Sequence, residues 1–282
     1  MEEDEIALDK ALESGDSDLV FFVLLHLKAK LPLSSFFRVI NARPTATALI
    51  EASAQADDAE LLKDLYYQDD RRLDGAHVFV REALRQPDVR GTLDQLALAA
   101  KLLSDSKEMV FELKALQETA QLLRVQERYS TELSEDFAGL SVNAFLYKLI
   151  QLGYLPRAKK VVAEFKVGEK TWWWVRLRAL VARRDWGELE EIARVRKSPI
   201  GWEPFFNAVI GAGNLKLAAV FVPKCTSGDK VVMWEKCGMR VKAAEEAVRN
   251  KDEAALERLR AAAGVGTVEG REIDRLVSGL KR

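Results

Sequence analysis

The sequence is poor in the residues that metal sites, redox centres and disulfide-stabilised folds require. Its 282 residues include two cysteines, Cys225 and Cys237, whose spacing fits neither a redox CxxC pair nor a zinc site. The two histidines, His26 and His77, lie far apart, and no cluster of cysteine and histidine surrounds either one. We therefore expect two reduced thiols, no bound metal, and a core or groove position for His26 in its apolar helix.

Long apolar runs and a strong charge of one sign are also missing. The longest apolar run, Leu19–Leu27, is interrupted by His26 and is shorter than the roughly 20 residues that span a bilayer. The acidic start, MEEDE, is unlike a signal peptide. With 43 basic and 44 acidic residues the formal net charge is −1, so we expect no field over the whole molecule that attracts nucleic acid or a membrane. These absences predict a cytoplasmic protein.

Phosphate-binding loops are absent as well. No GxxxxGK[ST] motif occurs, and the dinucleotide-like start Gly211-Ala212-Gly213 is followed by Lys216 where a third glycine is required. We therefore predict that the protein is not an enzyme and uses no cofactor. Catalytic, cofactor-binding and metal-binding residues are all expected to be absent.

The pattern that is present is helical. Apolar residues recur at helical spacing, whereas alternation with a period of two over five or more residues does not occur. Short turns recur roughly 25–33 residues apart in the C-terminal half, the range of helical solenoid repeats. These turns are Leu152-Gly153-Tyr154, Arg184-Asp185-Trp186, Gly213-Asn214 and Cys237-Gly238. The sequence therefore predicts an all-α fold, an α-solenoid of stacked antiparallel helix hairpins that forms a single domain over residues 1–282.

Local signals predict several helix boundaries. The longest helix is expected over Lys107–Leu133, and Ser141 is expected to cap the N-terminus of the next helix. Asp74-Gly75 is a turn signal before a helix at Ala76–Arg85, and Thr92 is a candidate N-cap. These signals place the longest helix near the middle of the chain.

Five of the six tryptophans lie in one stretch, Lys170–Phe206, which marks a packing centre. Within this stretch, Thr171–Arg183 and Asp185–Val195 have the pattern of two helices joined by a tight turn. Such a turn makes the two helices antiparallel neighbours. We therefore expect Leu180 to lie in the core opposite Leu189.

Trp172, Trp173 and Trp174 cannot share one helix face, because successive side chains on a helix point about 100° apart. We expect two of them to pack in the core. The third is expected on or beside a protein-binding surface, where tryptophan is enriched. A second aromatic stretch, Tyr66–Arg72, is expected to be a solvated helix end with Asp–Arg pairs.

Three stretches carry a resemblance to a known family. They are LLKDLYYQDDRR at Leu61–Arg72, LLRVQERYSTEL at Leu122–Leu133, and WWWVRLRAL…DWGELEEIARVRKSPIGWEPF within Lys170–Phe206. In order and spacing they closely resemble the C-terminal domain of the family of vacuolar protein sorting-associated protein 16, a core subunit of the HOPS and CORVET tethering complexes. The resemblance runs from Leu61 to the C-terminus, and the KSPIG pentapeptide makes it fairly specific.

The resemblance implies a binding scaffold rather than an enzyme. In that family an N-terminal β-propeller precedes the solenoid, so the chain resembles the C-terminal part of a longer subunit. The family's solenoid holds the Sec1/Munc18-type subunit of the complex, which templates SNARE assembly for membrane fusion. By resemblance, the chain recruits that subunit and contacts other HOPS and CORVET subunits. The near-neutral charge, in which acidic residues are interleaved with the basic ones, predicts that it binds no nucleic acid. It would be cytoplasmic and peripheral on endosome and vacuole or lysosome membranes, with membrane association indirect, through the complex.

The predicted partner surface lies on two helices. The helix expected over Lys107–Leu133 is predicted to be more than twice as long as the other predicted helices, and it carries small Ala115, where a partner could approach closely. The helix that starts at Thr171 mixes aromatic residues with arginine, as protein interfaces do. By resemblance, the family's Sec1/Munc18 contact falls in these two helices, with arginine common at the position of Thr171, a departure that bears on any salt bridge there. The predicted contact residues are Ala115, Leu116, Glu118, Thr119, Leu122, Thr171, Trp172, Val175 and Arg178.

Other functions compete with this interpretation. A clathrin-like coat or adaptor solenoid in vesicle transport would bind cargo or coat subunits and ignore a Sec1/Munc18 protein. An RNA-binding helical repeat would bind RNA in a salt-dependent way, and a nucleotide-dependent enzyme would need an intact phosphate loop. Ala115 could also be a core residue, in which case it would make no contact with a partner.

Overall fold

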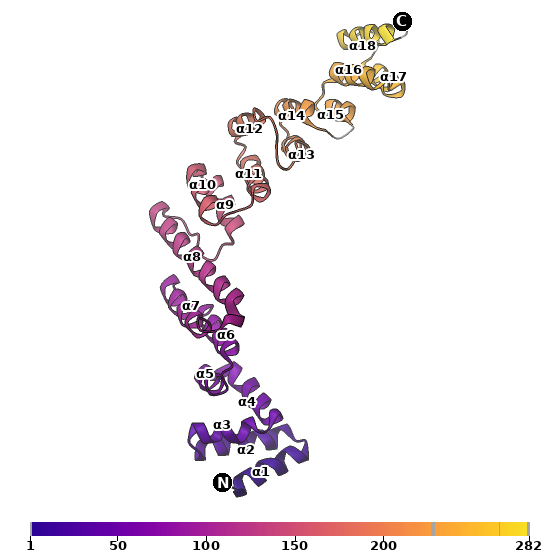
Figure 1. Cartoon of the computed structure of the whole chain (residues 1–282). Helices are drawn as coiled ribbons and strands as arrows, with labels where there is room; N and C mark the ends of the chain where they lie inside the picture. Colours follow the sequence, from indigo (N-terminus) through magenta and orange to yellow (C-terminus); the bar gives the residue numbers. More distant parts are fainter. Residues whose placement is uncertain (1, 227–228, 265, 281–282) are drawn as a thin grey trace. The chain divides into compact units, whose positions relative to one another are not determined.

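The structure, a computed structural model, describes residues 2–226, 229–264 and 266–280. Within these ranges α-helices and two short 3₁₀ helices follow one another without a β-strand, which confirms the predicted all-α fold (Figure 1). The helices are α1 (Glu2–Ser14), α2 (Ser17–Lys30), α3 (Leu33–Asn41), α4 (Pro44–Asp57), α5 (Ala59–Gln68), α6 (Arg72–Ala83), α7 (Val89–Leu103), η1 (Lys107–Met109), α8 (Val110–Leu133), α9 (Val142–Gln151), α10 (Leu155–Glu164), α11 (Glu169–Arg183), α12 (Trp186–Ala193), α13 (Glu203–Gly211), α14 (Leu215–Phe221), η2 (Val222–Lys224), α15 (Lys230–Lys236), α16 (Arg240–Asn250), α17 (Glu253–Ala263) and α18 (Val268–Leu280).

The helices group into two compact units, residues 1–139 and residues 140–282. The first unit contains α1 to α8, and the second contains α9 to α18. Each unit packs around its own apolar side chains. The single domain expected over residues 1–282 stays a prediction.

In the first unit the helices pack in two groups. α1 to α5 enclose an apolar cluster that includes Phe36, Phe37 and Ile40 of α3, each at most 2 % exposed. α6 packs along α7, and α7 along α8, around small side chains such as Ala99 and Ala120. Each helix therefore buries its apolar face on its neighbours, as a repeat array requires.

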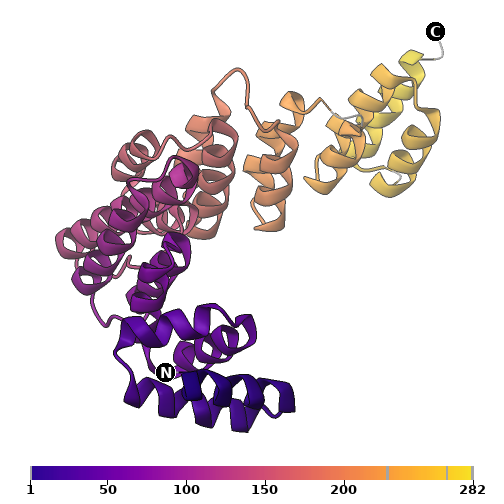
Figure 2. The ribbon, with the colours of Figure 1, turned by 60° about the horizontal axis from the view of Figure 1, so that its bottom comes forward.

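In the second unit successive hairpins stack on one another (Figure 2). α9 packs against α10 and α11, and α11 packs in turn against α12 and α13. Trp202, Phe205 and Phe221 form an aromatic centre with ring centroids 5.4 or 5.7 Å apart, and Trp173 meets Phe205 edge-on at 5.9 Å. This stacking confirms the predicted solenoid of helix hairpins and the packing role of the tryptophan-rich stretch.

The turn between α11 and α12 is made by two residues. Arg184 adopts a left-handed conformation with φ of 59°, and the Asp185 carboxylate accepts a hydrogen bond from the Glu188 N–H at 3.3 Å. The tight turn makes α11 and α12 neighbours, and both Leu180 and Leu189 are at most 1 % exposed. The core position predicted for Leu180 is confirmed.

Two predictions from local sequence signals, the turn at Asp74-Gly75 and the N-cap at Thr92, are wrong. The predicted turn at Asp74-Gly75 is wrong, because α6 begins at Arg72 and runs through both residues. Gly75 is buried, and a Cβ there would lie 3.4 Å from Leu102 Cδ1, so the small residue serves the packing of α6 on α7. Thr92 is not the N-cap of α7 either.

The helix start of α7 depends on an acidic residue instead. Asp88 accepts a hydrogen bond from the Gly91 N–H at 2.7 Å, which places the first turn of the helix ahead of Thr92. The longest helix ends at Leu133 as predicted but starts at Val110, after a short 3₁₀ turn. The predicted N-cap of α9 is confirmed, since the Ser141 hydroxyl accepts from the Ala144 N–H at 3.2 Å.

His26 is exposed on α2, so the core or groove position expected for it is wrong. α2 is apolar around most of its circumference, and periodicity alone does not show which side is buried. Val20, Leu24 and Leu27 take the buried side. His26 lies on the opposite side of the helix.

Candidate protein-binding surfaces

The N-terminal half of α8 presents one side to solvent. On the other side Ala120 is buried, and Leu113, Leu116 and Leu123 pack half-buried against the core of the first unit. Residues four and seven positions apart stay on one side of a helix, so the outward residues form a stripe. We call this stripe the α8 face; its exposed members are Phe111, Lys114, Ala115, Glu118 and Thr119.

Three of the five contact residues predicted on α8 belong to this face. Ala115, Glu118 and Thr119 are exposed, so the alternative that Ala115 is a core residue is wrong. Leu116 lies on the core side, because it continues the apolar stripe that packs on α7, and Leu122 is half-buried. The α8 face therefore contains the small residue and its polar neighbours but leaves out Leu116.

Sequence reasoning missed Phe111, which is 79 % exposed at the start of the α8 face. The signal was available, since Phe111 precedes Ala115 by four residues and therefore lies on the same side of the helix. Val110 beside it is also 60 % exposed. An aromatic side chain that the core does not use is the residue type enriched in interfaces.

The polar groups of the α8 face form weak interactions within their own helix. The Thr119 hydroxyl donates to the Ala115 carbonyl at 2.8 Å, and Lys114 Nζ lies 3.8 Å from Glu118 Oε1. Both charged side chains are mostly exposed, and exposed pairs of this kind contribute little stability. They can therefore exchange their contacts for those of a partner at low cost.

α11 presents a second outward stripe in the other unit. Leu177, Ala179 and Leu180 are buried, and Val175 is half-buried. The exposed residues Thr171, Trp174 and Arg178 lie at spacings of three and four, and we call them the α11 face. In the described part of the chain Arg178 has no ion pair, whereas Arg176 is held 2.9 Å from Glu188.

The three consecutive tryptophans divide between core and surface. Trp173 packs edge-on against Phe205, and Trp172 is half-buried. Trp174 is 45 % exposed and stands between Thr171 and Arg178 on the α11 face. The expectation that one of the three reaches the surface is confirmed, and that residue is Trp174 rather than the predicted contact residue Trp172.

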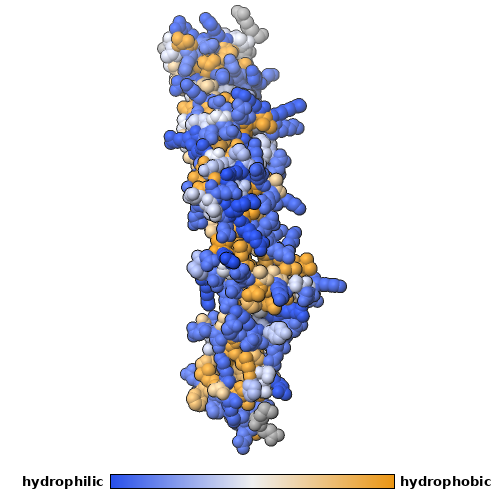
Figure 3. Space-filling view, turned by 90° about the vertical axis from the view of Figure 1, so that its left-hand side faces the viewer, coloured by the Kyte–Doolittle hydropathy of each residue, from blue (hydrophilic) through white to orange (hydrophobic). Residues whose placement is uncertain are grey.

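The α8 face belongs to the first unit and the α11 face to the second. That the two act together on one partner stays a prediction. On the side of the molecule in Figure 3, hydrophilic side chains predominate and apolar ones appear in separate patches.

A hollow of about 920 Å³ lies between α5, α6 and α7 of the first unit. It is lined by part of the LLKDLYYQDDRR stretch, including Tyr67, which is 83 % exposed. The expected Asp–Arg pairs are confirmed here: Arg72 lies 2.8 Å from Asp70, and Arg71 lies 2.9 Å from Asp74. Hydrogen bonds to Glu51 and Asp74 raise the pKa of Arg71, which stays charged.

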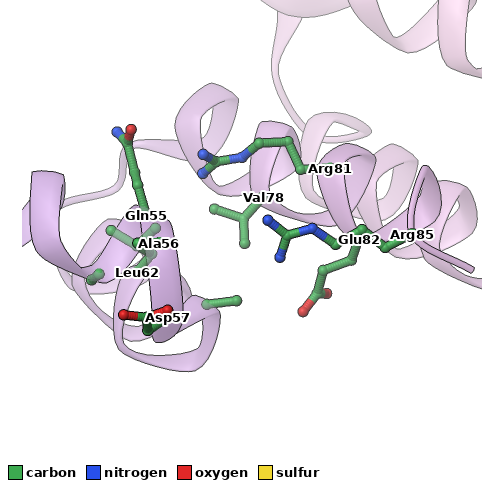
Figure 4. A pocket seen from close by; sticks show the side chains of 10 residues that line it. Gln55, Ala56, Asp57, Leu62, Val78, Arg81, Glu82 and Arg85 are labelled. Atoms are coloured by element: carbon green, nitrogen blue, oxygen red, sulfur yellow. The ribbon is translucent and has the colours of Figure 1, made fainter.

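A smaller hollow of about 80 Å³ lies where α4 and α5 meet α6 (Figure 4). Leu62 and Val78 form its apolar wall, and the side chains of Arg81 and Glu82 stand at its edge. It has room for a few water molecules, whereas small-molecule sites usually measure roughly 300–1,000 Å³.

Within the described ranges, no group of three or more His, Cys, Asp or Glu side chains is placed to hold a metal ion. None of the helices found in these ranges combines the length and apolarity needed to cross a membrane. Cys225 and Cys237 are free and buried, and burial raises the pKa of Cys225 to about 11, so its neutral thiol is unreactive at pH 7.

Comparison with known proteins supports a common origin over nearly the whole chain. The profile of a family described as "Vps16, C-terminal region" matches residues 1–274. The "Probable vacuolar protein sorting-associated protein 16 homolog" of Schizosaccharomyces pombe is 39 % identical over 255 residues, which cover 89 % of this chain and 30 % of that protein. A Dictyostelium discoideum homolog is 32 % identical over 259 residues, 89 % of this chain and 31 % of its own length.

A more distant relative shows the same coverage. "Vacuolar protein sorting-associated protein 16" of Saccharomyces cerevisiae is 26 % identical over 240 residues, which cover 84 % of this chain and 30 % of that protein. The chain thus spans about three tenths of the length of the curated relatives it matches. The similarity extends beyond the predicted stretch from Leu61 and includes the first helices.

Proposed function

Because the chain belongs to the family of Vps16 C-terminal regions, we propose that it is a non-enzymatic scaffold of a membrane-tethering complex. In this proposal it binds and recruits a Sec1/Munc18-type subunit for SNARE-mediated fusion at endosomes and vacuoles or lysosomes. The family match over residues 1–274 carries the proposal, since the relatives are named for vacuolar protein sorting. HOPS and CORVET are the proposed complexes, and the chain would be cytoplasmic and peripheral on those membranes.

The physical support for a binding role is that the helices have one buried side and one exposed side. The solenoid uses one side of each helix for its own stability and leaves the other side free. The α8 face then offers Phe111 beside small Ala115, and the α11 face offers Trp174 beside Arg178. Tryptophan and arginine are enriched at binding hot spots, and aromatic residues are enriched in interfaces generally.

The decisive test is capture of the Sec1/Munc18-type subunit by wild-type protein and by Ala115→Asp. We expect the variant to weaken capture by at least about tenfold, because a carboxylate would be buried without a partner at the contact. Its melting temperature should not change, since Ala115 is exposed. The matched control is Ala52→Asp, which places the same side chain at an exposed position of α4 in the same unit.

The outcomes of this experiment distinguish where the interface lies and whether the proposed partner binds. Weakened capture by Ala115→Asp alone supports a partner contact at the α8 face. Full capture by both variants would move the interface away from α8. No capture by the wild-type protein would contradict the proposed partner and favour the coat or adaptor function.

A further inference from the structure

The near-neutral chain consists of two units of opposite charge. Residues 1–139 contain 27 acidic and 16 basic side chains, whereas residues 140–282 contain 17 acidic and 27 basic ones. The first unit therefore has a formal net charge of −11 and the second a net charge of +10. A total of −1 conceals this separation, so the second unit has the attraction for anions that the whole chain lacks.

Within the second unit, positive charge gathers on the loop between α12 and α13. We call residues 194–201 the basic loop, and Figure 2 shows it as a long connection that rises clear of the helices on either side. Arg194, Arg196 and Lys197 are all exposed. Val195 between the two arginines is 43 % exposed, so an apolar side chain stands among the three cations.

The basic loop has a defined conformation. The Ile200 N–H donates to the Ser198 hydroxyl at 3.3 Å, and the Gly201 N–H donates to the Ser198 carbonyl at 3.2 Å. Gly201 has φ of 77°, a conformation that favours glycine. The KSPIG pentapeptide, which begins with Lys197, is thus a folded turn directly after Arg196.

Both ends of the loop rest on the aromatic centre of the unit. Trp202, which follows the loop, is 6 % exposed and stacks on Phe221 with ring centroids 5.7 Å apart. Lys224 donates to the Val195 carbonyl at 3.3 Å, with its ammonium group 5.0 Å from the centre of the Trp202 ring. Lys224 therefore brings a fourth cation to the base of the loop.

Most of this charge is not used inside the protein. Arg194 lies 2.9 Å from Glu191, an exposed pair of low strength. The carboxylate of Glu203, the nearest acid after the loop, accepts hydrogen bonds from the N–H groups of Trp202 and Thr226. Across the described residues the structure gives no ion pair to Arg196 or Lys197.

We infer that the basic loop docks on the surface of an anionic phospholipid bilayer. Clusters of four or more Lys and Arg side chains bind anionic headgroups, and each cation near the surface adds to the affinity. Val195 distinguishes a bilayer from nucleic acid or an acidic peptide, because an exposed apolar side chain among the cations of a loop can enter the headgroup layer. The contact would add direct attachment to the membrane association expected through a complex.

The test is co-sedimentation of the full chain with vesicles. Neutral vesicles contain phosphatidylcholine only, and anionic vesicles contain about 30 mol% phosphatidylserine. We expect binding to the anionic vesicles alone, and a several-fold loss of binding when salt is raised from about 0.1 M to about 0.5 M. The double variant Arg196→Glu, Lys197→Glu should reduce binding to anionic vesicles at least about fivefold.

The matched control is Arg271→Glu, Arg275→Glu, which makes the same change in net charge at two exposed positions of α18. This control should bind anionic vesicles as the wild type does, and both double variants should keep the wild-type melting temperature. An equal loss in the two double variants would overturn the loop as the docking site, since net charge alone would then explain binding. Equal binding to neutral and anionic vesicles would overturn the proposal as well.

A further arm separates this inference from the proposed function. Capture of the Sec1/Munc18-type subunit is measured with the same loop variant, and we expect it to be unchanged. If the loop variant lost that capture while keeping wild-type vesicle binding, the loop would be a protein contact and the membrane proposal would be wrong. Normal capture with reduced vesicle binding supports the membrane contact, whichever complex the chain belongs to.

Discussion

Trp174 is the large side chain that α11 leaves in solvent, beside Thr171 and Arg178. We expect Trp174→Ala to weaken partner capture by about tenfold or more without lowering the melting temperature, because exposed tryptophans at contacts act as anchors. Trp173→Ala is the contrasting variant. It should lower the melting temperature, because Trp173 packs on Phe205. If Trp174→Ala captured the partner as well as the wild type does, Trp174 would not anchor a contact at the α11 face.

A substitution at Leu180 tests which side of α11 faces the core. It is 1 % exposed in the core of the second unit. We expect Leu180→Asp to destabilise the protein by about 3–5 kcal/mol, because the carboxylate has neither water nor a partner there. Denaturant unfolding measures the loss. Ala182→Asp, two residues on at an exposed position of the same helix, should change stability by less than about 0.5 kcal/mol, and equal effects would mean that the helix phase is wrong.

At the scale of elements, Asp58 joins two helices of the first unit. Its carboxylate lies 2.8 Å from Lys28 Nζ of α2 and accepts the Leu61 N–H at 3.1 Å, as the N-cap of α5. The hydrogen bond from Lys28 and the capping bond hold the pKa of Asp58 below its usual value of 3.8. A carboxyl whose pKa is lowered in the folded state stabilises that state above its usual pKa, and this stabilisation is lost as pH falls through the lowered value.

Asp58→Asn tests this link, because asparagine can still cap α5 but cannot form the ion pair. We expect the variant to be less stable than the wild type by about 1 kcal/mol or less at pH 7, since the pair is partly exposed. The gap in melting temperature should narrow as pH falls below 3.8 and the wild-type carboxylate is protonated. A gap that stayed constant down to pH about 2 would contradict a charge effect.

At the scale of the whole molecule, the helices group into two compact units. We expect calorimetric unfolding to show two overlapping transitions, since two compact units need not unfold together. Leu180→Asp should shift only the transition of the second unit. A single domain over residues 1–282 would instead unfold in one transition, and Leu180→Asp would then move all of it.

The sequence by itself determined the features that depend on neighbours a few residues away. Apolar spacing predicted the all-α fold, the hydroxyl of Ser141 predicted the start of α9, and the predicted end of the longest helix at Leu133 is the observed end of α8. Helix hydrogen bonds and caps act within a single turn or two, so their signals are legible in the chain. The family resemblance could also be recognised in the sequence, because it rests on three contiguous stretches of residues.

Only the tertiary structure decided which side of each helix is free. Gly75 looked like a turn until α7 was seen packed against it, and Phe111 and Trp174 became candidate contacts only once the buried sides of α8 and α11 were known. Likewise, only the structure placed the cations of the basic loop on the connection between α12 and α13. Burial depends on helices that are distant in sequence, and their arrangement is set by the packing of the whole unit, which no local pattern of residues contains.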